Sequence, residues 1–504
     1  MDSSRTSSAN STIQKISPEN LGGTLSSFPT KADRKRIDLG LENEGIWRGN
    51  FYEENGERGA FRLKKYFEQD PEKEKILALS INVARIVITK STRFFVGGKM
   101  KFSAVTENKK SQKEIQKAID EIVQRSELRK LLREEANALQ VHGYSTMRSI
   151  AEKDGEKVKS FIEGVSFANT FPIFDYRGRK TQHIIGKYLK KGNGVGQETF
   201  FYAQRYFKEN GVVKIAHELY KASGYDVKEK ASFSVLGEGY SELEGKIETS
   251  VLEEIPIVQI DDLKLGSEVF PTGVIDQIRS PAEEICDCLT RISTQFIKHL
   301  SAKIAVPKNA LEIEITDDGR EVVKSTNLEV IPVDEGDIIP QYITNSNPLI
   351  EQQFKQLEKL LNLVAAAAEV PEKFLGIEQK GGVEKVESLK LKMAEFLRKI
   401  EDYQEGIKYG VEKLISDSLK LENVSLPEDF SVKVVLREGL PRDKEQEMRT
   451  HSGAVDSGIE SRKRAIMEYH GLSEQEAQEE MKKIKEEDAL LSPEPINFED
   501  NLNA

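Results

Sequence analysis

Apolar side chains recur at helical spacing on both sides of a short break between residues 340 and 421. Residues three or four positions apart share one face of an α-helix. The pattern therefore predicts a helix over 347–369, a loop over 370–387 and a long helix over 388–421. The apolar positions are Ile350, Phe354, Leu357, Leu361 and Val364 before the break, and Leu389, Met393, Phe396, Ile400, Tyr403, Ile407, Val411 and Leu414 after it.

The break contains residues that disfavour a helix. Pro371 lacks the backbone N–H that a helix interior uses. Gly376, Gly381 and Gly382 adopt backbone angles that other residues avoid. We therefore expect the two helices to be separate.

Another helix and a small β segment precede this region. A helical stripe from Val274 to Phe296 predicts a helix over 272–301, with Pro281 at its start or at a kink. Between 302 and 346 the sequence predicts a β insert, with a hairpin at Asp318-Gly319. The chain would leave the first long helix, pass through this small β module and return in the second long helix. The two helices should therefore run roughly antiparallel.

The first 143 residues are predicted to be an arm, a loop and three helices. Residues 1–39 are rich in serine and are expected to form a flexible arm, and 40–72 form a polar loop. Helices are predicted over 73–92, from Ser111 with Glu114 in a capping box, and from Ser126 to Gly143. A turn and a strand are predicted over 94–105.

Residues 145–262 change to the alternating pattern of β-strands. Asp154-Gly155 and Asn210-Gly211 are hairpin signals between apolar alternations, so this section is predicted to be antiparallel sheet. The glycines of 190–198 could suggest a phosphate loop, but such a loop opens a helix, and the segment that follows is typical of a strand.

The C-terminal part is predicted to contain a strand and helices. The strand lies within 422–442, helices follow at 461–469 and 473–487, and 488–504 form a disordered tail. The whole chain is thus expected to be of the α+β class.

Composition limits the functional classes. The 504 residues include 38% hydrophobic and 32% charged residues, which is typical of a soluble globular chain of two to four domains. The formal charge of −11 argues against a protein that coats nucleic acid. Cys286 and Cys288, the two cysteines, are expected to be free thiols. The most apolar stretch, 76–89, is interrupted by Arg85 and is too short to cross a membrane.

Motifs for catalysis and metal binding are missing from the sequence. The six histidines show no HExxH spacing, and Arg93 stands where a phosphate loop ending at Lys99 would need glycine. No GxSxG elbow occurs. We therefore expect no cofactor, no metal and no enzyme, although carboxylates of a two-metal nuclease could come from separate strands.

Long amphipathic helices without an active site favour a part of an assembly. Their apolar stripes would pack on a neighbouring copy. The residues expected at that contact are Ile350, Phe354, Leu357, Leu361, Phe396, Ile400 and Tyr403.

The order of these elements resembles that of the portal proteins of tailed bacteriophages, in particular the branch of long-tailed phages of Gram-positive hosts. One such stretch is LSINVARIVITKSTRFFVGGKMKFSA, at 79–104; the others are 128–156, 167–189, 338–376 and 436–488. The resemblance covers about residues 40–487. It departs at the loop, where we would expect a serine-glycine pair and find Gly381-Gly382-Val383.

The resemblance implies a subunit of a ring of about twelve copies at the portal vertex of the virion capsid, assembled in the host cytoplasm. By position, the subunit would have a wing, two stem helices, a clip, a tunnel loop, a long helix, a return strand to the wing and a crown. The wing would occupy 40–271, the two stem helices 272–301 and 347–369, and the clip 302–346. The tunnel loop would occupy 370–387, the long helix 388–421, the return strand 422–442 and the crown 443–487.

The resemblance also implies partners. Double-stranded DNA would pass through the ring, and the terminase large subunit, the head-completion adaptor, the scaffold and the major capsid protein would bind it. At the clip, the residues that contact a partner would be Asp317, Asp318, Gly319 and Arg320.

The loop would face the DNA with Lys373, Lys380, Gly381, Gly382 and Lys385. Twelve copies carry a charge of about −130, which repels DNA unless it is countered locally. Either the three lysines form a cationic constriction, or they are ordinary solvated residues among Glu372, Glu378, Glu384 and Glu387. The alternatives to a portal are another ring-forming head-tail connector and a metal-dependent DNA-processing enzyme.

Overall fold

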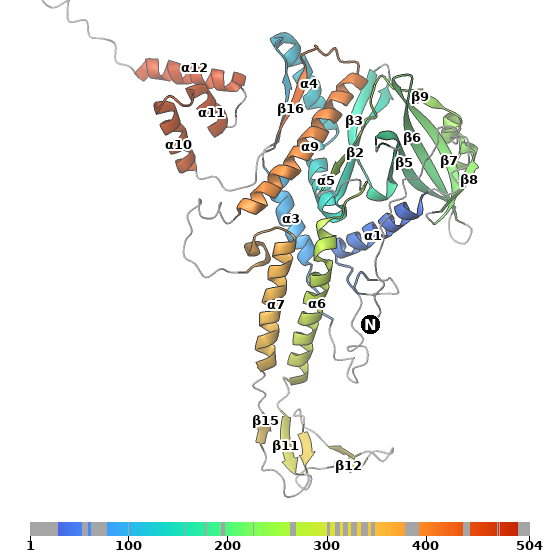
Figure 1. Ribbon diagram of the computed structural model, residues 1–504, viewed down its shortest axis with the longest axis vertical. Coiled ribbons are helices and arrows are strands. Elements are labelled where there is room, and N and C mark those ends of the chain that lie inside the picture. Colours follow the sequence, from blue (N-terminus) through green and yellow to red (C-terminus); the bar gives the residue numbers. More distant parts are fainter. Residues whose placement is uncertain are drawn as a thin grey trace, which may run out of the picture. The chain divides into compact units, whose positions relative to one another are not determined.

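The structure is a computed structural model that carries side chains. It describes residues 29–52, 59–61, 78–262, 269–299, 348–377, 393–436 and 444–491, apart from 99, 156, 176, 178, 193–196, 225, 471 and 473, and five short strands between 303 and 343. The chain divides into two compact units, Met1–Val383 with Leu389–Gly439, and Glu384–Ser388 with Leu440–Ala504. Helices and sheets are mixed, as the predicted α+β class requires (Figure 1).

The first helix, α1 (Lys31–Arg48), corrects the predicted arm and loop, because it begins inside 1–39 and continues into 40–72. Thr30 and Asp33 cap its start with a reciprocal capping box. Only Ile37, Gly40, Asn43 and Ile46 are buried. Two of these four are not apolar, so the sequence carries a weak helical stripe. Gly40 is required by packing, since a Cβ there would lie 2.2 Å from the Phe167 ring.

Asparagine caps set the starts of the next two helices. α3 (Val83–Val96) begins after Asn82, whereas the predicted helix began at residue 73; residues 78–82 are not helical. α4 (Lys109–Arg125) begins after Asn108, whose side chain accepts from the Lys110 and Ser111 backbone, so Ser111 is not the cap. α5 (Leu128–His142) ends at Gly143 as predicted, with φ of 81°.

The predicted antiparallel β section is confirmed as two sheets. One has the order β10-β2-β3 and the other β4-β5-β6-β7-β8, with β9 paired to β7. Both predicted hairpins are present, at β2-β3 and at β6-β7. The glycines of 190–198 are followed by β6, which pairs with β5, and not by the helix that a phosphate loop opens, so the phosphate loop is excluded. The strands are β2 (Tyr144–Asp154), β3 (Lys157–Val165), β4 (Thr170–Phe174), β5 (Lys180–Lys191), β6 (Glu198–Glu209), β7 (Val212–Ser223), β8 (Asp226–Ala231), β9 (Ile247–Thr249) and β10 (Ile257–Asp261).

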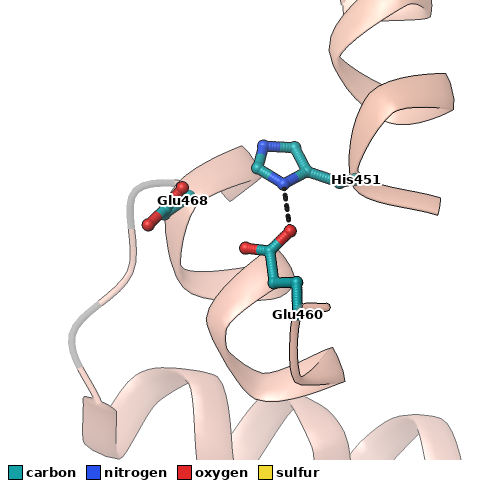
Figure 2. Close-up of side chains that lie close together, drawn as sticks. All are labelled: His451, Glu460 and Glu468. Atoms are coloured by element: carbon teal, nitrogen blue, oxygen red, sulfur yellow. Dashed lines mark hydrogen bonds and ion pairs between the residues drawn. The ribbon is translucent and has the colours of Figure 1, made fainter. Parts of the chain in front are cut away.

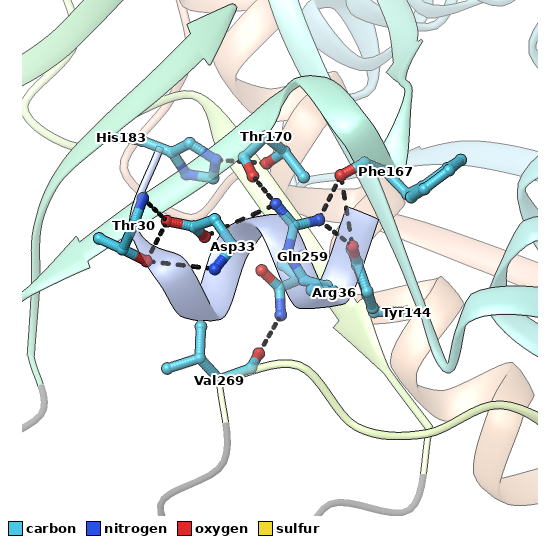
Figure 3. A network of polar contacts seen from close by, with 9 residues as sticks. All are labelled: Thr30, Asp33, Arg36, Tyr144, Phe167, Thr170, His183, Gln259 and Val269. Carbon is cyan, nitrogen blue, oxygen red and sulfur yellow. Dashed lines mark hydrogen bonds and ion pairs between the residues drawn. The ribbon is translucent and has the colours of Figure 1, made fainter. Parts of the chain in front are cut away.

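A partly buried arginine joins α1 to this β section (Figure 3). The Arg36 guanidinium donates to the Tyr144 hydroxyl and the Phe167 carbonyl, and to the Thr170 carbonyl at 3.1 Å. It also lies 4.1 Å from the centroid of the Phe270 ring. Both of its terminal nitrogens therefore have partners, which offsets part of the cost of burying the charge, whereas Nε has no hydrogen-bond partner.

The predicted pair of long helices is also present. α6 (Val274–His299) and α7 (Pro348–Ala367) pack side by side and run in opposite directions (Figure 1). Pro281 lies inside α6, not at its start. Between them β12 (Ile313–Ile315) and β13 (Glu321–Val323) form the predicted hairpin. The remaining strands of this module are β11 (Lys303–Pro307), β14 (Val330–Val333) and β15 (Gln341–Ile343).

The long helix returns the chain to the first part of the same unit. α9 (Ala394–Leu421) packs against α3 and the β10-β2-β3 sheet. The next strand, β16 (Ser431–Leu436), pairs antiparallel with β1 (Met100–Val105), so the predicted return strand is present. Residues 388–392 of the predicted long helix lie outside the described residues.

The second unit consists of helices in the part that the structure describes. α11 (Arg462–His470) matches its prediction. α10 (Lys444–Asp456) is an additional helix, and α12 (Glu474–Leu491) continues into the segment predicted as a disordered tail. In both units, no described helix combines the length and the apolar character needed to cross a bilayer.

Candidate functional site

Three phenylalanine rings pack together and attach both ends of the predicted tunnel loop to α3. Phe94 belongs to α3, Phe374 to the short 3-10 helix η7 (Glu372–Leu375) and Phe396 to α9. The Phe94 and Phe374 rings stack with centroids 5.4 Å apart. Phe396 meets both edge-on, at 5.3 Å from Phe94 and 5.1 Å from Phe374. We call Phe94, Phe374 and Phe396 the aromatic anchor; edge-to-face pairs of this kind add to the gain from burial.

Lys90 fixes η7 from the same helix. Its ammonium group donates to the Phe374 carbonyl and lies 5.9 Å from the centroid of the Phe374 ring. Lys90 and Phe94 are one helical turn apart, so both reach η7 from one face of α3. The backbone and the ring of Phe374 are thus both held.

The end of α7 is joined to α9. Glu369 has a left-handed φ of 52°, and the Val370 N–H donates to the Ala365 carbonyl at 2.9 Å, which closes the helix with a Schellman turn. The Lys399 ammonium group then donates to the Ala368 carbonyl at 2.9 Å and lies 3.5 Å from a Glu369 carboxylate oxygen. Both edges of 378–392 are therefore fixed to the first unit.

Of the five predicted DNA-facing residues, one lies in η7 and the other four lie outside the described residues. Lys373 is exposed and stands next to Phe374 in η7. Lys380, Gly381, Gly382 and Lys385 lie outside the described residues. No sequence signal pointed to Phe94, Lys90 or Lys399, because each lies far along the chain from the residue that it contacts.

Three of the predicted subunit contacts are interior residues, which corrects that prediction. Phe396, Ile400 and Tyr403 are 2%, 0% and 6% exposed. The Tyr403 ring packs on Phe95 with centroids 4.7 Å apart, and the Gln404 side chain donates to the Phe95 carbonyl at 2.9 Å. The apolar stripe of α9 is thus covered by its own chain.

Helices α6 and α7 differ from α9, because they keep apolar side chains exposed. Phe354 is 49% exposed and Leu363 on the same helix is 58% exposed. Phe296 on α6 is also exposed. Leu357 and Leu361 are half-buried, and the side chain of Ile350 lies outside the described residues. Leu363 escaped prediction because it lies off the apolar stripe.

The two cysteines are buried on α6 as free thiols, as predicted. Burial raises the pKa of both thiols. The Cys288 sulfur lies 3.6 Å from the Gln353 carbonyl of α7, so it belongs to the face of α6 that packs on α7. The predicted partner-contact residues of the clip, Asp317, Asp318, Gly319 and Arg320, lie outside the described residues; β12 and β13 flank them.

A cavity of about 220 Å³ lies between α5 and the β2-β3 hairpin. The Glu135 carboxylate accepts from the Ser145 hydroxyl at 2.6 Å, and burial raises the pKa of Glu135 to about 7. Burial likewise lowers the pKa of His142, which stacks on Phe167, to about 4. Both shifts favour the neutral side chains, as expected for titratable groups in an interior.

Comparison with known proteins agrees with the architecture. No curated protein matches the chain. A family model described as "Phage portal protein, SPP1 Gp6-like" matches residues 49–491, close to the range of the resemblance noted from the sequence. The match includes α6 and α7, the small β module between them, the aromatic anchor and α9. The chain therefore belongs to the SPP1 Gp6-like family of phage portal proteins.

Proposed function

We propose that this portal protein assembles into a ring of about twelve copies at one vertex of the capsid, and that double-stranded DNA passes through the ring during packaging and ejection. The observation that carries the proposal is the antiparallel pair α6 and α7, which leaves and returns through one small β module. In a ring, such a pair serves as the wall segment that each copy contributes.

The exposed apolar residues of the stem support lateral contacts between copies. Phe296, Phe354 and Leu363 stay exposed after α6 and α7 have packed together. Single exposed apolar side chains are normal on a surface, but several on one two-helix element favour an interface. A ring arises when one surface of a copy binds a different surface of the next and the rotation closes.

The loop 370–387 is proposed to face the DNA. Its edges are held by the aromatic anchor, by Lys90 and by Lys399, so load on the loop passes into α3 and α9. DNA that slides cannot be held by many phosphate contacts, since each adds affinity. Lys373, Lys380 and Lys385 would supply a local counter-charge, with Gly381 and Gly382 between them. Replacing the three lysines with alanine should change packaging efficiency while rings still form; unchanged packaging would contradict their role.

The clip is proposed to bind the terminase large subunit and later the head-completion adaptor, with Asp317, Asp318, Gly319 and Arg320 at the contact. The scaffold and the major capsid protein would surround the ring in the capsid. Exchange of the motor for the adaptor needs a small, accessible element, and a β hairpin between two helices is suited to that role.

Electron microscopy of the purified full-length chain tests the ring. We expect closed particles with a central channel and about twelve-fold symmetry, and a matching mass by native mass spectrometry. Phe354→Ser with Leu363→Ser should lower the fraction of rings by weakening the stem contacts. Tyr409→Ser, which changes an exposed aromatic residue on α9, is the control and should leave ring formation unchanged. A monomer or an open fibre from the unaltered chain would overturn the proposal.

A further inference from the structure

The end of α10 turns the chain back beside its own helix. Gly458 has a left-handed φ of 72°, and its N–H donates to the Val455 carbonyl at 3.1 Å. The Ile459 and Glu460 N–H groups both donate to the Ala454 carbonyl, at 2.9 and 3.1 Å. This Schellman turn reverses the chain. Glu460 therefore lies beside α10, and its carboxylate is 2.9 Å from Nδ1 of His451.

The next helix brings a second carboxylate to the same place. Ser461 caps α11, since its hydroxyl accepts from the Arg464 N–H at 3.2 Å. Glu460, Arg464 and Glu468 then follow one another at single-turn spacing. One ligand atom from each of His451, Glu460 and Glu468 lies within 4.8 Å of the others, and Figure 2 shows the two carboxylates beside the imidazole ring.

We propose that His451, Glu460 and Glu468 bind a divalent transition-metal ion of the zinc type. One imidazole nitrogen and two carboxylate oxygens are a ligand set that zinc accepts, with water as the fourth ligand. Tetrahedral bonds of about 2.1 Å place ligand atoms about 3.4 Å apart, so ligand atoms that lie up to 4.8 Å apart need to close by at most about 1.4 Å. Glu468 is exposed and can make that movement by a change of rotamer.

The weak core of the second unit gives such an ion a role. Among its described residues only Ala477 is buried, while Met448 and Ile459 are exposed. A small unit with little apolar burial is usually held by metals, by disulfides or by association. A metal at His451 would join α10 to the following turn and to α11.

The competing interaction is an ion pair on α11. Arg464 Nε lies 2.9 Å from a Glu468 carboxylate oxygen and 4.0 Å from one of Glu460. Exposed ion pairs of this kind contribute little to stability. A metal ion would therefore displace Arg464 from Glu468, and removal of Arg464 should strengthen metal binding.

The test uses the full-length chain, stripped with a chelator and titrated with Zn²⁺ by calorimetry and with Co²⁺ by visible absorption. We expect one ion per chain and a Co²⁺ absorption band that reports nitrogen and oxygen ligands. His451→Ala and Glu460→Gln should each weaken binding at least about tenfold, as expected for loss of a metal ligand. Glu468→Gln should do the same without endangering the fold, because the side chain is exposed.

Two matched variants decide between the metal site and ordinary surface binding. His470→Ala removes another histidine of this unit that lies outside the cluster and should leave the affinity unchanged. Arg464→Ala should tighten binding. The proposal is overturned if no saturable binding of one ion per chain is found at millimolar metal, or if His470→Ala weakens binding as much as His451→Ala does.

Discussion

The first unit and the second unit of this portal protein are stabilised in different ways. The first buries long apolar stripes and holds a partly buried charged side chain, Arg36, whose terminal nitrogens donate to oxygens of the β section. In the second, the described helices have many charged residues and Ala477 alone is buried. Apolar burial scales with the size of a unit. The first unit is therefore expected to keep its fold by itself, and the second to depend on a bound ion or a neighbouring copy.

The largest difference between the two units should appear in the free energy of unfolding when one isoleucine in each unit is truncated. Ile400 is 0% exposed and Ile459 is 84% exposed. Ile400→Ala should lower the free energy of unfolding by about 2–5 kcal/mol, because it leaves a cavity in the core. Ile459→Ala should change it by less than about 0.5 kcal/mol. Denaturant unfolding followed by circular dichroism measures both. Equal effects would show that the second unit has a core of its own.

The pH dependence of the first unit should be set partly by Glu135. Its folded pKa of about 7 lies above the usual 4.5, so the folded state binds the extra proton between these values. The resulting stability is complete below pH 4.5 and is lost as the pH rises to 7. Glu135→Gln should therefore gain stability over the unaltered chain by up to about 3 kcal/mol between pH 4.5 and 8.

The control for that experiment is Glu134→Gln, which changes the exposed neighbour on the same helix. Denaturant unfolding across this pH range should give nearly parallel curves for Glu134→Gln and the unaltered chain. A flat difference between Glu135→Gln and the unaltered chain would mean that Glu135 is ionised in the folded state at all these pH values.

The smallest changes in stability are expected for alanine substitutions at two glycines within helices, Gly40 and Gly453. A Cβ at Gly40 would lie 2.2 Å from the Phe167 ring, whereas at Gly453 it would meet nothing within 4 Å. Gly40→Ala should lower the free energy of unfolding by about 1–3 kcal/mol through overpacking. Gly453→Ala should raise helix stability by about 0.5–1 kcal/mol. Thermal unfolding of both variants measures the contrast. A stabilising Gly40→Ala would mean that α1 can move away from Phe167.

The portal family is a structural one. The catalytic alternative considered from the sequence, a metal-dependent DNA-processing enzyme, therefore has no part in the proposed function. The ion proposed at His451 would be structural, and it escaped sequence reasoning because its three ligands lie 9 and 8 positions apart rather than at a familiar metal spacing.

The sequence by itself determined the elements whose signals are local. Hairpins form at Asp154-Gly155 and Asn210-Gly211 because these pairs adopt the turn geometry, and α5 ends at Gly143 because glycine accepts a positive φ. The helical stripes of α6, α7 and α9 were visible because their apolar residues repeat with the helical period. The order of these elements was enough to indicate the portal family.

Only the tertiary structure decided what each apolar face contacts. Phe396, Ile400 and Tyr403 show the same periodicity as Phe354, yet α9 is covered by α3 and the β10-β2-β3 sheet, while Phe354 stays exposed. The aromatic anchor joins residues 94, 374 and 396. Periodicity fixes which side chains share a face, but burial depends on segments hundreds of residues away, and no local pattern encodes that meeting.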